Sequence, residues 1–265
     1  MGALGRLAVV VAVLSVACGG GPSPTGSSAP RGLYVRLRFA KSPGVLRYEV
    51  SQATRQEAGP VIFKRRRTLY VTQVIEDSLD ARLIHVRIDS GRGSEKMPMS
   101  LGPFPGFRGW FNDQRDRLDT IATDLGVEGY RADVFDGTMP LPTDSITQGG
   151  TWTVDPRRHA MFHVQDAPVH AVARGVVKRI SILNNDTIAV LGFTFDVKGK
   201  FTQKDGREID VHGNEEGEET FSVNQGITLR LHVAGKIEWD TDVMGARLEH
   251  VYTIVHGETD RTLIP

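Results

Sequence analysis

The sequence contains a single cysteine, Cys18, and carries no net charge. One cysteine excludes an intramolecular disulfide. The 32 basic residues balance the 32 acidic residues, and no basic face or acidic tail stands out, so the sequence predicts no nucleic-acid partner. The nucleophile motif Gly-x-Ser-x-Gly is missing, and residues 91–93 (Gly-Arg-Gly) lack the lysine of a phosphate-binding loop. These absences predict a protein that is not an enzyme and uses no cofactor.

An apolar run too short to span a membrane lies at the N-terminus. It extends from Leu7 to Leu14, behind the positive charge of Arg6, and is followed by small residues and Cys18. A transmembrane helix needs roughly 20 apolar residues, so the run is typical of a secretory signal instead. We therefore expect residues 1–17 to be a signal peptide.

The end of this run resembles the lipobox of bacterial lipoproteins, in which an invariant cysteine becomes the acylated first residue. Cys18 matches that cysteine and Ala17 the small residue before it, whereas Ser15 stands where the family usually has leucine. The resemblance implies that Cys18 is lipidated and anchors the protein to a membrane. Gly19, where aspartate would signal retention, implies the outer membrane with the protein facing the periplasm. The alternative is an ordinary secreted protein with a thiol beside a generic cleavage site.

A polar segment separates the lipidation site from the body of the protein. Glycine, serine and proline dominate residues 19–30, which offer nothing to bury. We expect residues 18–31 to comprise the lipidated cysteine and a disordered tether. About 250 residues remain after the signal, enough for one large β domain or two small units.

The body alternates apolar and polar residues over short runs, which is the pattern of half-buried β-strands. Turn residues between these runs predict hairpins. The expected hairpins span residues 33–50, 68–88 and 177–195, and a further strand spans residues 220–233. Three other segments are expected to be loops, namely Lys64–Arg67, Ser90–Gly109 and Glu215–Glu219. For Glu215–Glu219 the alternative to a solvated loop is a calcium site, but the segment lacks the spaced oxygen ligands of a calcium loop.

Two parts of the chain share a pattern of residues in the same order. Trp110 and Trp239 are each followed by Asp three residues later and then by Arg-Leu and an acidic residue, with gaps that differ by one residue. A hairpin turn accommodates such an insertion and a helix does not. We expect Trp110 and Trp239 to occupy equivalent places in two related β-rich units, residues 32–138 and 153–265. Prolines and paired glycines make residues 139–152 the expected linker.

The apolar face of an open sheet must be covered, either by its twin unit, by a loop or by a ligand. The segment Pro98–Phe111 combines aromatic residues with glycine and proline, so we expect it to be a lid or a permanent plug over that face. Its candidate ligand-binding residues are Phe104, Phe107, Trp110 and Phe111.

Three histidines, His159, His163 and His170, lie close together in the sequence. Histidines four apart on a helix can bind zinc, but this segment is rich in valine and has no His-Glu-x-x-His motif. In an extended chain, residues four apart are separated by about 13 Å. We therefore predict no metal ligand here, and keep a metal-dependent envelope enzyme that uses this region as the alternative function.

Together these patterns predict a mostly β fold of antiparallel hairpins in two related units, open as a half-barrel or arranged as a sandwich, with few short helices. The whole resembles exported bacterial lipoproteins with a duplicated β-rich body and, more loosely, half-barrel lipoprotein carriers of acyl chains. The resemblance implies a non-enzymatic, membrane-anchored protein of the bacterial cell envelope that binds an apolar ligand or a protein partner.

Overall fold

A computed structural model describes residues 32–40, 43–78, 81–93, 104–111, 115, 117–120, 139–154, 157–160, 167–202, 208–244 and 248–265. Within these ranges the chain is antiparallel β-structure and contains no helix, which confirms the expected fold class. The strands are β1 (Gly44–Ala58), β2 (Val61–Ser78), β3 (Ala81–Gly93), β4 (Phe104–Phe111), β5 (Arg117–Thr120), β6 (Thr151–Val154), β7 (Arg157–Ala160), β8 (Ala167–Leu183), β9 (Asp186–Thr202), β10 (Glu208–Ser222), β11 (Ile227–Met244) and β12 (Leu248–Ile264).

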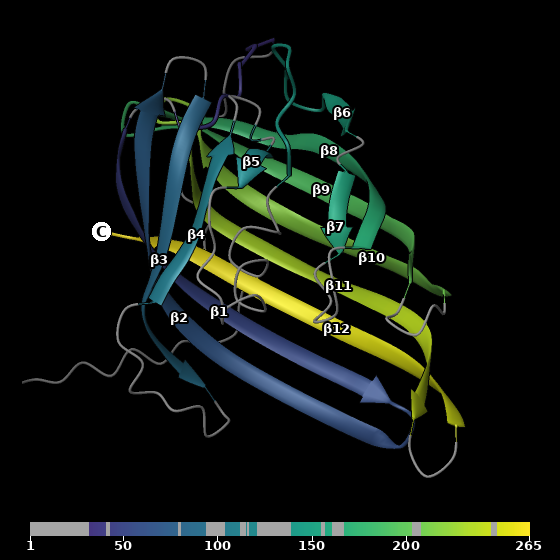
Figure 1. The fold of residues 1–265 in the computed structure, drawn as a ribbon. Coiled ribbons are helices and arrows are strands. Elements are labelled where there is room, and N and C mark those ends of the chain that lie inside the picture. Colours follow the sequence, from purple (N-terminus) through teal and green to yellow (C-terminus); the bar gives the residue numbers. More distant parts are fainter. Residues whose placement is uncertain are drawn as a thin grey trace, which may run out of the picture.

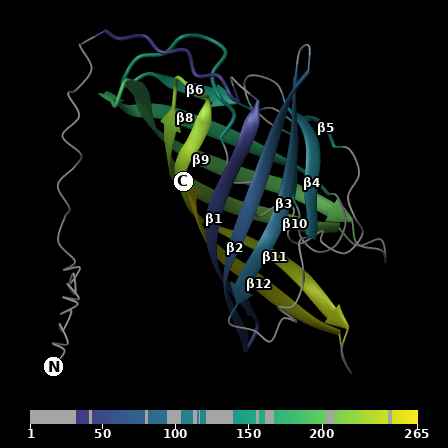
Figure 2. The ribbon, with the colours of Figure 1, turned by 90° about the vertical axis from the view of Figure 1, so that its left-hand side faces the viewer.

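The twelve strands form one sheet in the order β5-β4-β3-β2-β1-β12-β11-β10-β9-β8-β6, with β7 paired to β8 beside β6. Among the described residues, the outermost strands β5 and β6 do not pair with each other, so the sheet is open. Strands such as β2 and β11 have 18 residues each and are therefore about 60 Å long. A sheet of such strands twists strongly, so β3 and β4 are steeply inclined to β8 to β10, whereas β1 runs alongside β12 (Figures 1 and 2).

Two of the expected hairpins are present, and both are longer than the sequence pattern indicates. Strands β2 and β3 pair up to Ser78 and Ala81, and β8 and β9 pair up to Leu183 and Asp186. Asn184 and Asn185 turn the second hairpin with φ angles of 49° and 63°. Asparagine adopts this left-handed conformation more readily than most residues, which explains the turn.

The first expected hairpin, residues 33–50, is wrong. Strand β1 begins only at Gly44, and Val35 instead forms an isolated bridge with Ile146, with N–O distances of 2.9 and 2.8 Å. The expected strand at residues 220–233 is two strands, because Val223–Gly226 forms the turn between β10 and β11. Alternation continues on both sides of this turn, so periodicity alone does not reveal it.

All three segments expected to be loops contain strand. Lys64–Arg67 lies inside β2, and Glu215–Glu219 lies inside β10. The outer face of each strand is exposed and accepts charges such as Glu216 and Glu218, so a charged run does not interrupt the strand. Of Ser90–Gly109, the first four residues belong to β3 and the last six to β4.

The expected linker packs against the body of the protein. Met139 and Leu141 are buried, Ile146 pairs with Val35, and the indole Nε1 of Trp152 donates a hydrogen bond of 2.9 Å to the carbonyl of Pro140. Strands from both sides of this segment belong to the same sheet, since β1 pairs with β12. The division into two related units remains a prediction.

Trp110 and Trp239 are not equivalent in strand pairing. Each lies in an antiparallel hairpin, but Trp110 pairs with Asp119, whereas Trp239 pairs with Thr253 rather than with Glu249, the counterpart of Asp119. Strands β11 and β12 continue pairing beyond this level, so their turn comes later than that between β4 and β5. The expected superposition of the two hairpins is therefore wrong.

Candidate functional site

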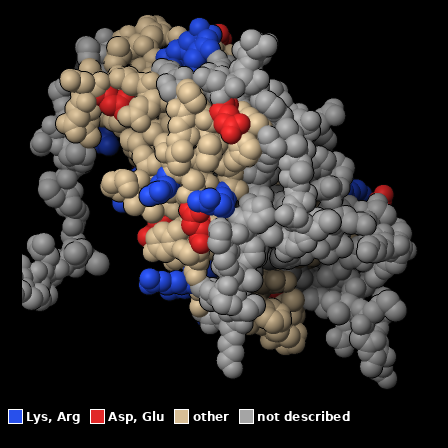
Figure 3. All heavy atoms as spheres, turned by 60° about the vertical axis from the view of Figure 1, so that its left-hand side comes forward, with Lys and Arg blue, Asp and Glu red and all other residues tan. Residues whose placement is uncertain are grey.

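Alternation along the strands gives the sheet an inner and an outer face. In β1, Tyr48, Val50 and Gln52 are buried and face inward, whereas Arg47 and Glu49 are exposed. The outer face carries both signs of charge, and in Figure 3 the described basic and acidic side chains are interspersed among uncharged ones. The inner face therefore holds most of the buried apolar side chains.

One end of the inner face is filled by protein, and we call it the sealed end. Residues 35–40 and 141–146 pack there against β1 to β3 and β8 to β10 in one apolar cluster. The largest fully buried side chains of this cluster are Leu37, Ile84, Leu141, Ile180, Leu191 and Phe221. Segments outside the sheet thus cover its apolar face at this end, a role that helices have in many other folds.

A buried ion pair crosses the sealed end. Arg115 donates from Nη1 to Oε2 of Glu219 at 3.0 Å, and the side chains are 2% and 0% exposed. Thr228 donates a hydrogen bond of 2.6 Å to Oε1 of the same carboxylate. The guanidinium carbon lies 5.3 Å from the ring centres of Phe39 and Phe221, a favourable cation–π distance. Glu219 is thus bonded on both oxygens, as a buried charge requires.

Tyr48 and Arg261 form a second polar group beside this pair. The Tyr48 hydroxyl donates a hydrogen bond of 3.1 Å to the carbonyl of Thr228, and the Arg261 guanidinium lies 4.8 Å from the centre of the tyrosine ring. Burial raises the pKa of the Tyr48 hydroxyl above its ordinary value and lowers the pKa of Arg261. Both shifts follow from the exclusion of water at the sealed end.

Glycines occupy the middle of the inner face. A Cβ at Gly217 would lie 2.4 Å from Cζ of Phe193, and one at Gly235 would lie 2.5 Å from Cγ of Glu215, so no side chain fits at either position. Gly257, which pairs with Gly235, is exposed. Within the described part of the chain, a Cβ there meets no atom closer than 4 Å. The inner face is therefore accessible at Gly257.

Beyond these glycines the inner face carries several apolar residues, some of them partly exposed, and we call this region the open end. The strand register places Val211, Trp239 and Val61 in one row across the sheet, and Ile237 and Phe63 in the next. Ile237 and Trp239 are half-buried, whereas Val61 and Phe63 are 45% and 57% exposed. These apolar residues share a face with the sealed core, from which the row of Glu215, Gly235, Gly257 and Thr54 separates them.

The aromatic residues expected to form a lid belong to the sheet instead. Phe104, Phe107, Trp110 and Phe111 all lie in β4, where Phe104 pairs with Ile88. Aromatic residues are enriched in strands, whereas the glycines and the proline between them favoured a loop in the sequence-based prediction. Residues 98–103 of the expected lid lie outside the described residues.

The other expected site residues are placed only in part. Cys18 and His163 lie outside the described residues. His159 is in β7 and His170 in β8, and the register pairs them with Pro168 and Arg157, so they are offset by two residues on neighbouring strands. His159 and His170 thus lie on strands and not on one face of a helix, as a helical zinc motif requires.

Neither the roles of the inner-face glycines nor the buried ion pair of Arg115 and Glu219 was predicted from the sequence. The glycines at 217, 235 and 257 fall within alternating runs, a signal for close backbone or side-chain approach in strands.

No part of the chain that the structure describes forms a helix long and apolar enough to cross a membrane. No protein-family model and no curated protein matches the chain.

Proposed function

We propose that the protein is an exported bacterial lipoprotein that binds an apolar ligand along the inner face of its sheet. In this proposal Cys18 carries the lipid anchor, and the protein is held in the outer membrane facing the periplasm. The sequence supports the anchor and the export signal. The open sheet, with one filled end and one accessible end, supports the binding of a ligand.

The exposure of apolar side chains at the open end carries this proposal. Val61 and Phe63 are half-exposed and lie on the same face as half-buried Ile237 and Trp239. Each Å² of apolar surface that a ligand removes from water contributes about 25 cal/mol. An acyl chain over these residues and the bare backbone at Gly257 would cover surface that the described chain leaves accessible.

The polar groups of the inner face suit a structural role better than a catalytic one. Arg115, Glu219 and Thr228 are buried at the sealed end, where Arg115 and Thr228 each donate to the carboxylate of Glu219. A general acid or base has to reach the substrate within hydrogen-bond distance. These groups are covered by the core, so the proposed activity is binding without chemistry.

Filling the space at Gly257 tests the binding site. Titration of the full-length protein with a fluorescent fatty acid should give saturable binding, and Gly257→Phe should abolish it because the ring occupies the accessible part of the inner face. Gly44→Phe is the matched control, since a Cβ at Gly44 likewise meets no described atom within 4 Å but lies at the other end of β1. A folded Gly257→Phe variant that binds as tightly as the wild type would refute the proposed site.

The anchor is tested separately by Cys18→Ser. Without the thiol no lipid can be attached, so the variant should move from the membrane to the soluble fraction. If the variant stays on the membrane after a carbonate wash, the lipoprotein assignment is wrong, whatever the outcome of the ligand titration.

A further inference from the structure

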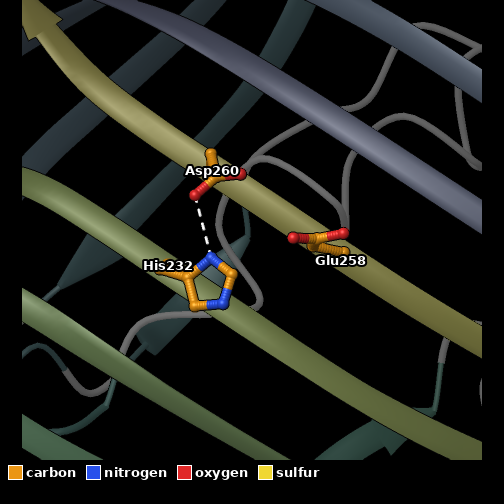
Figure 4. A group of neighbouring side chains, drawn as sticks. All are labelled: His232, Glu258 and Asp260. Atoms are coloured by element: carbon orange, nitrogen blue, oxygen red, sulfur yellow. Dashed lines mark hydrogen bonds and ion pairs between the residues drawn. The ribbon is translucent and has the colours of Figure 1, made fainter. Parts of the chain in front are cut away.

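Three metal-ligating side chains gather on the outer face, where β11 and β12 pair (Figure 4). His232 stands directly opposite Asp260, and Glu258 is two residues away from Asp260 on β12. Because residues two apart on a strand share a face, all three side chains project from the same side of the sheet. One ligand atom from each lies within 4.8 Å of the others.

The contacts within this group leave both carboxylates near the imidazole. Nδ1 of His232 lies 2.8 Å from Oδ1 of Asp260, and Glu258 takes no part in that hydrogen bond (Figure 4). The side chains of His232 and Asp260 are 49% and 55% exposed. Exposed side chains change rotamer easily, so the group can close around an ion without moving its strands.

The strands fix the spacing of the three ligands. Strand β12 lies between β11 and β1 and pairs with both of them on either side of Asp260. The backbone positions of the ligands are therefore set by the register of long strands. Rigid placement of this kind is what a metal site requires.

A hollow of about 410 Å³ adjoins the two carboxylates on the side of β1. It forms because small residues, Ser51 and Ala53, stand opposite Asp260 and Glu258, while longer side chains such as Arg66 follow on β2. Space beside the carboxylates leaves room for water molecules or an anionic ligand to complete a coordination shell.

We propose that His232, Glu258 and Asp260 bind a divalent transition-metal ion of the zinc type. Imidazole nitrogen suits zinc, cobalt and nickel, whereas magnesium and calcium prefer sites made of oxygen alone. Zinc lies about 2.1 Å from nitrogen and oxygen ligands, so its ligand atoms are at most about 4.2 Å apart. The three ligand atoms lie within 4.8 Å of one another, so changes of side-chain rotamer have to bring them closer together when zinc binds. The site lies on the face opposite the proposed ligand-binding surface and does not depend on it.

Zinc binding to the full-length protein tests this site. The protein, purified in detergent without a polyhistidine tag and stripped with a chelator, should bind one zinc ion in equilibrium dialysis. His232→Gln and Asp260→Asn should each weaken binding by more than roughly tenfold, the lower limit for losing even an indirect partner of a metal. His212→Gln, which changes an exposed histidine on the outer face of β10, is the matched control and should bind zinc like the wild type.

Several results would overturn the site. Wild-type protein that binds no zinc would do so, as would unchanged affinity in His232→Gln and Asp260→Asn. Binding that is lost in a His159→Gln/His163→Gln variant but kept in these two would place the metal on the other histidines. Circular dichroism without metal checks that each variant is folded, and Glu258→Gln repeats the test should either of the first two misfold. In the folded wild type, added zinc should also raise the unfolding midpoint, and this rise should disappear in the three variants.

Discussion

Arg115 and Glu219 meet inside the protein although they are 104 residues apart in the sequence, with Nη1 of one 3.0 Å from Oε2 of the other. Arg115 follows β4 and Glu219 lies in β10, so the contact joins two regions that are far apart in the strand order of the sheet. Aromatic rings of Phe39 and Phe221 flank the guanidinium. The pair thus holds the sealed end together from opposite parts of the chain.

Removing one partner of this pair should be strongly destabilising. Glu219→Leu leaves the buried guanidinium without its carboxylate, and we expect a loss of roughly 3–5 kcal/mol in the free energy of unfolding. Urea denaturation measures it. The double variant Arg115→Met/Glu219→Leu should regain most of the loss, because no charge then remains buried at this contact. A double variant that is less stable than Glu219→Leu would show that the pair contributes more than charge neutralisation.

Stability should fall in alkali because of Tyr48. Burial raises the pKa of its hydroxyl above the ordinary 10.0, so the unfolded chain ionises first and the stabilisation present below pH 10 is lost as the pH rises through the folded-state pKa. Tyr48→Phe should cost about 1 kcal/mol near neutral pH through the lost hydrogen bond to Thr228.

The gap between wild type and Tyr48→Phe should then narrow above pH 10, because the phenylalanine variant has no hydroxyl to ionise. Urea denaturation on both sides of that pH measures the gap. Tyr34→Phe, at a tyrosine that is 70% exposed, is the control and should leave stability unchanged. A gap that stays constant or widens with pH would contradict the buried, neutral state of Tyr48.

The turn between β8 and β9 should tolerate glycine better than alanine. Asn185 has a φ of 63°, a left-handed conformation that costs alanine about 1–2 kcal/mol. Asn185→Ala should therefore lower the thermal midpoint, while Asn185→Gly should leave it within a few degrees of the wild type. Equal midpoints for the two variants would mean that the turn does not have this geometry.

The same substitution should destabilise the protein at Gly217 but not at Gly257. Gly217→Ala places a methyl group against Phe193, and we expect a loss of about 1–3 kcal/mol from the resulting strain. Gly257→Ala meets open space and should not destabilise the fold. Chemical denaturation of the two variants side by side measures the difference, and comparable losses would mean that Gly257 is covered.

Sequence reasoning predicted the fold class because alternation is a local property. The hairpin at Asn184 and Asn185 followed from turn residues between apolar runs, and it is present. The same reasoning failed at residues 33–50, where Val35 pairs with Ile146, over a hundred residues away. Partners at that separation leave no periodic signal in a single sequence.

The acidic run Glu215–Glu219 was predicted to be a loop but lies in a strand, because a single sequence does not show which residues face inward. Glu216, Glu218 and Glu219 read as a solvated loop, yet two of them lie on the outer face of β10 and the third is buried against Arg115. Whether each glutamate is buried or exposed depends on which face of β10 the strand register turns inward. The proposed metal ligands could not be predicted from the sequence, because His232 lies beside Asp260 only through the pairing of β11 with β12.

An apolar ligand on the inner face of the open sheet should be detectable by native mass spectrometry. Wild-type protein purified under mild conditions should carry a noncovalent lipid-sized adduct that is released on unfolding, whereas Gly257→Phe, prepared in the same way, should carry none. Wild-type protein that is folded and free of any such adduct, and that takes up none when incubated with fatty acid or phospholipid, would contradict the account.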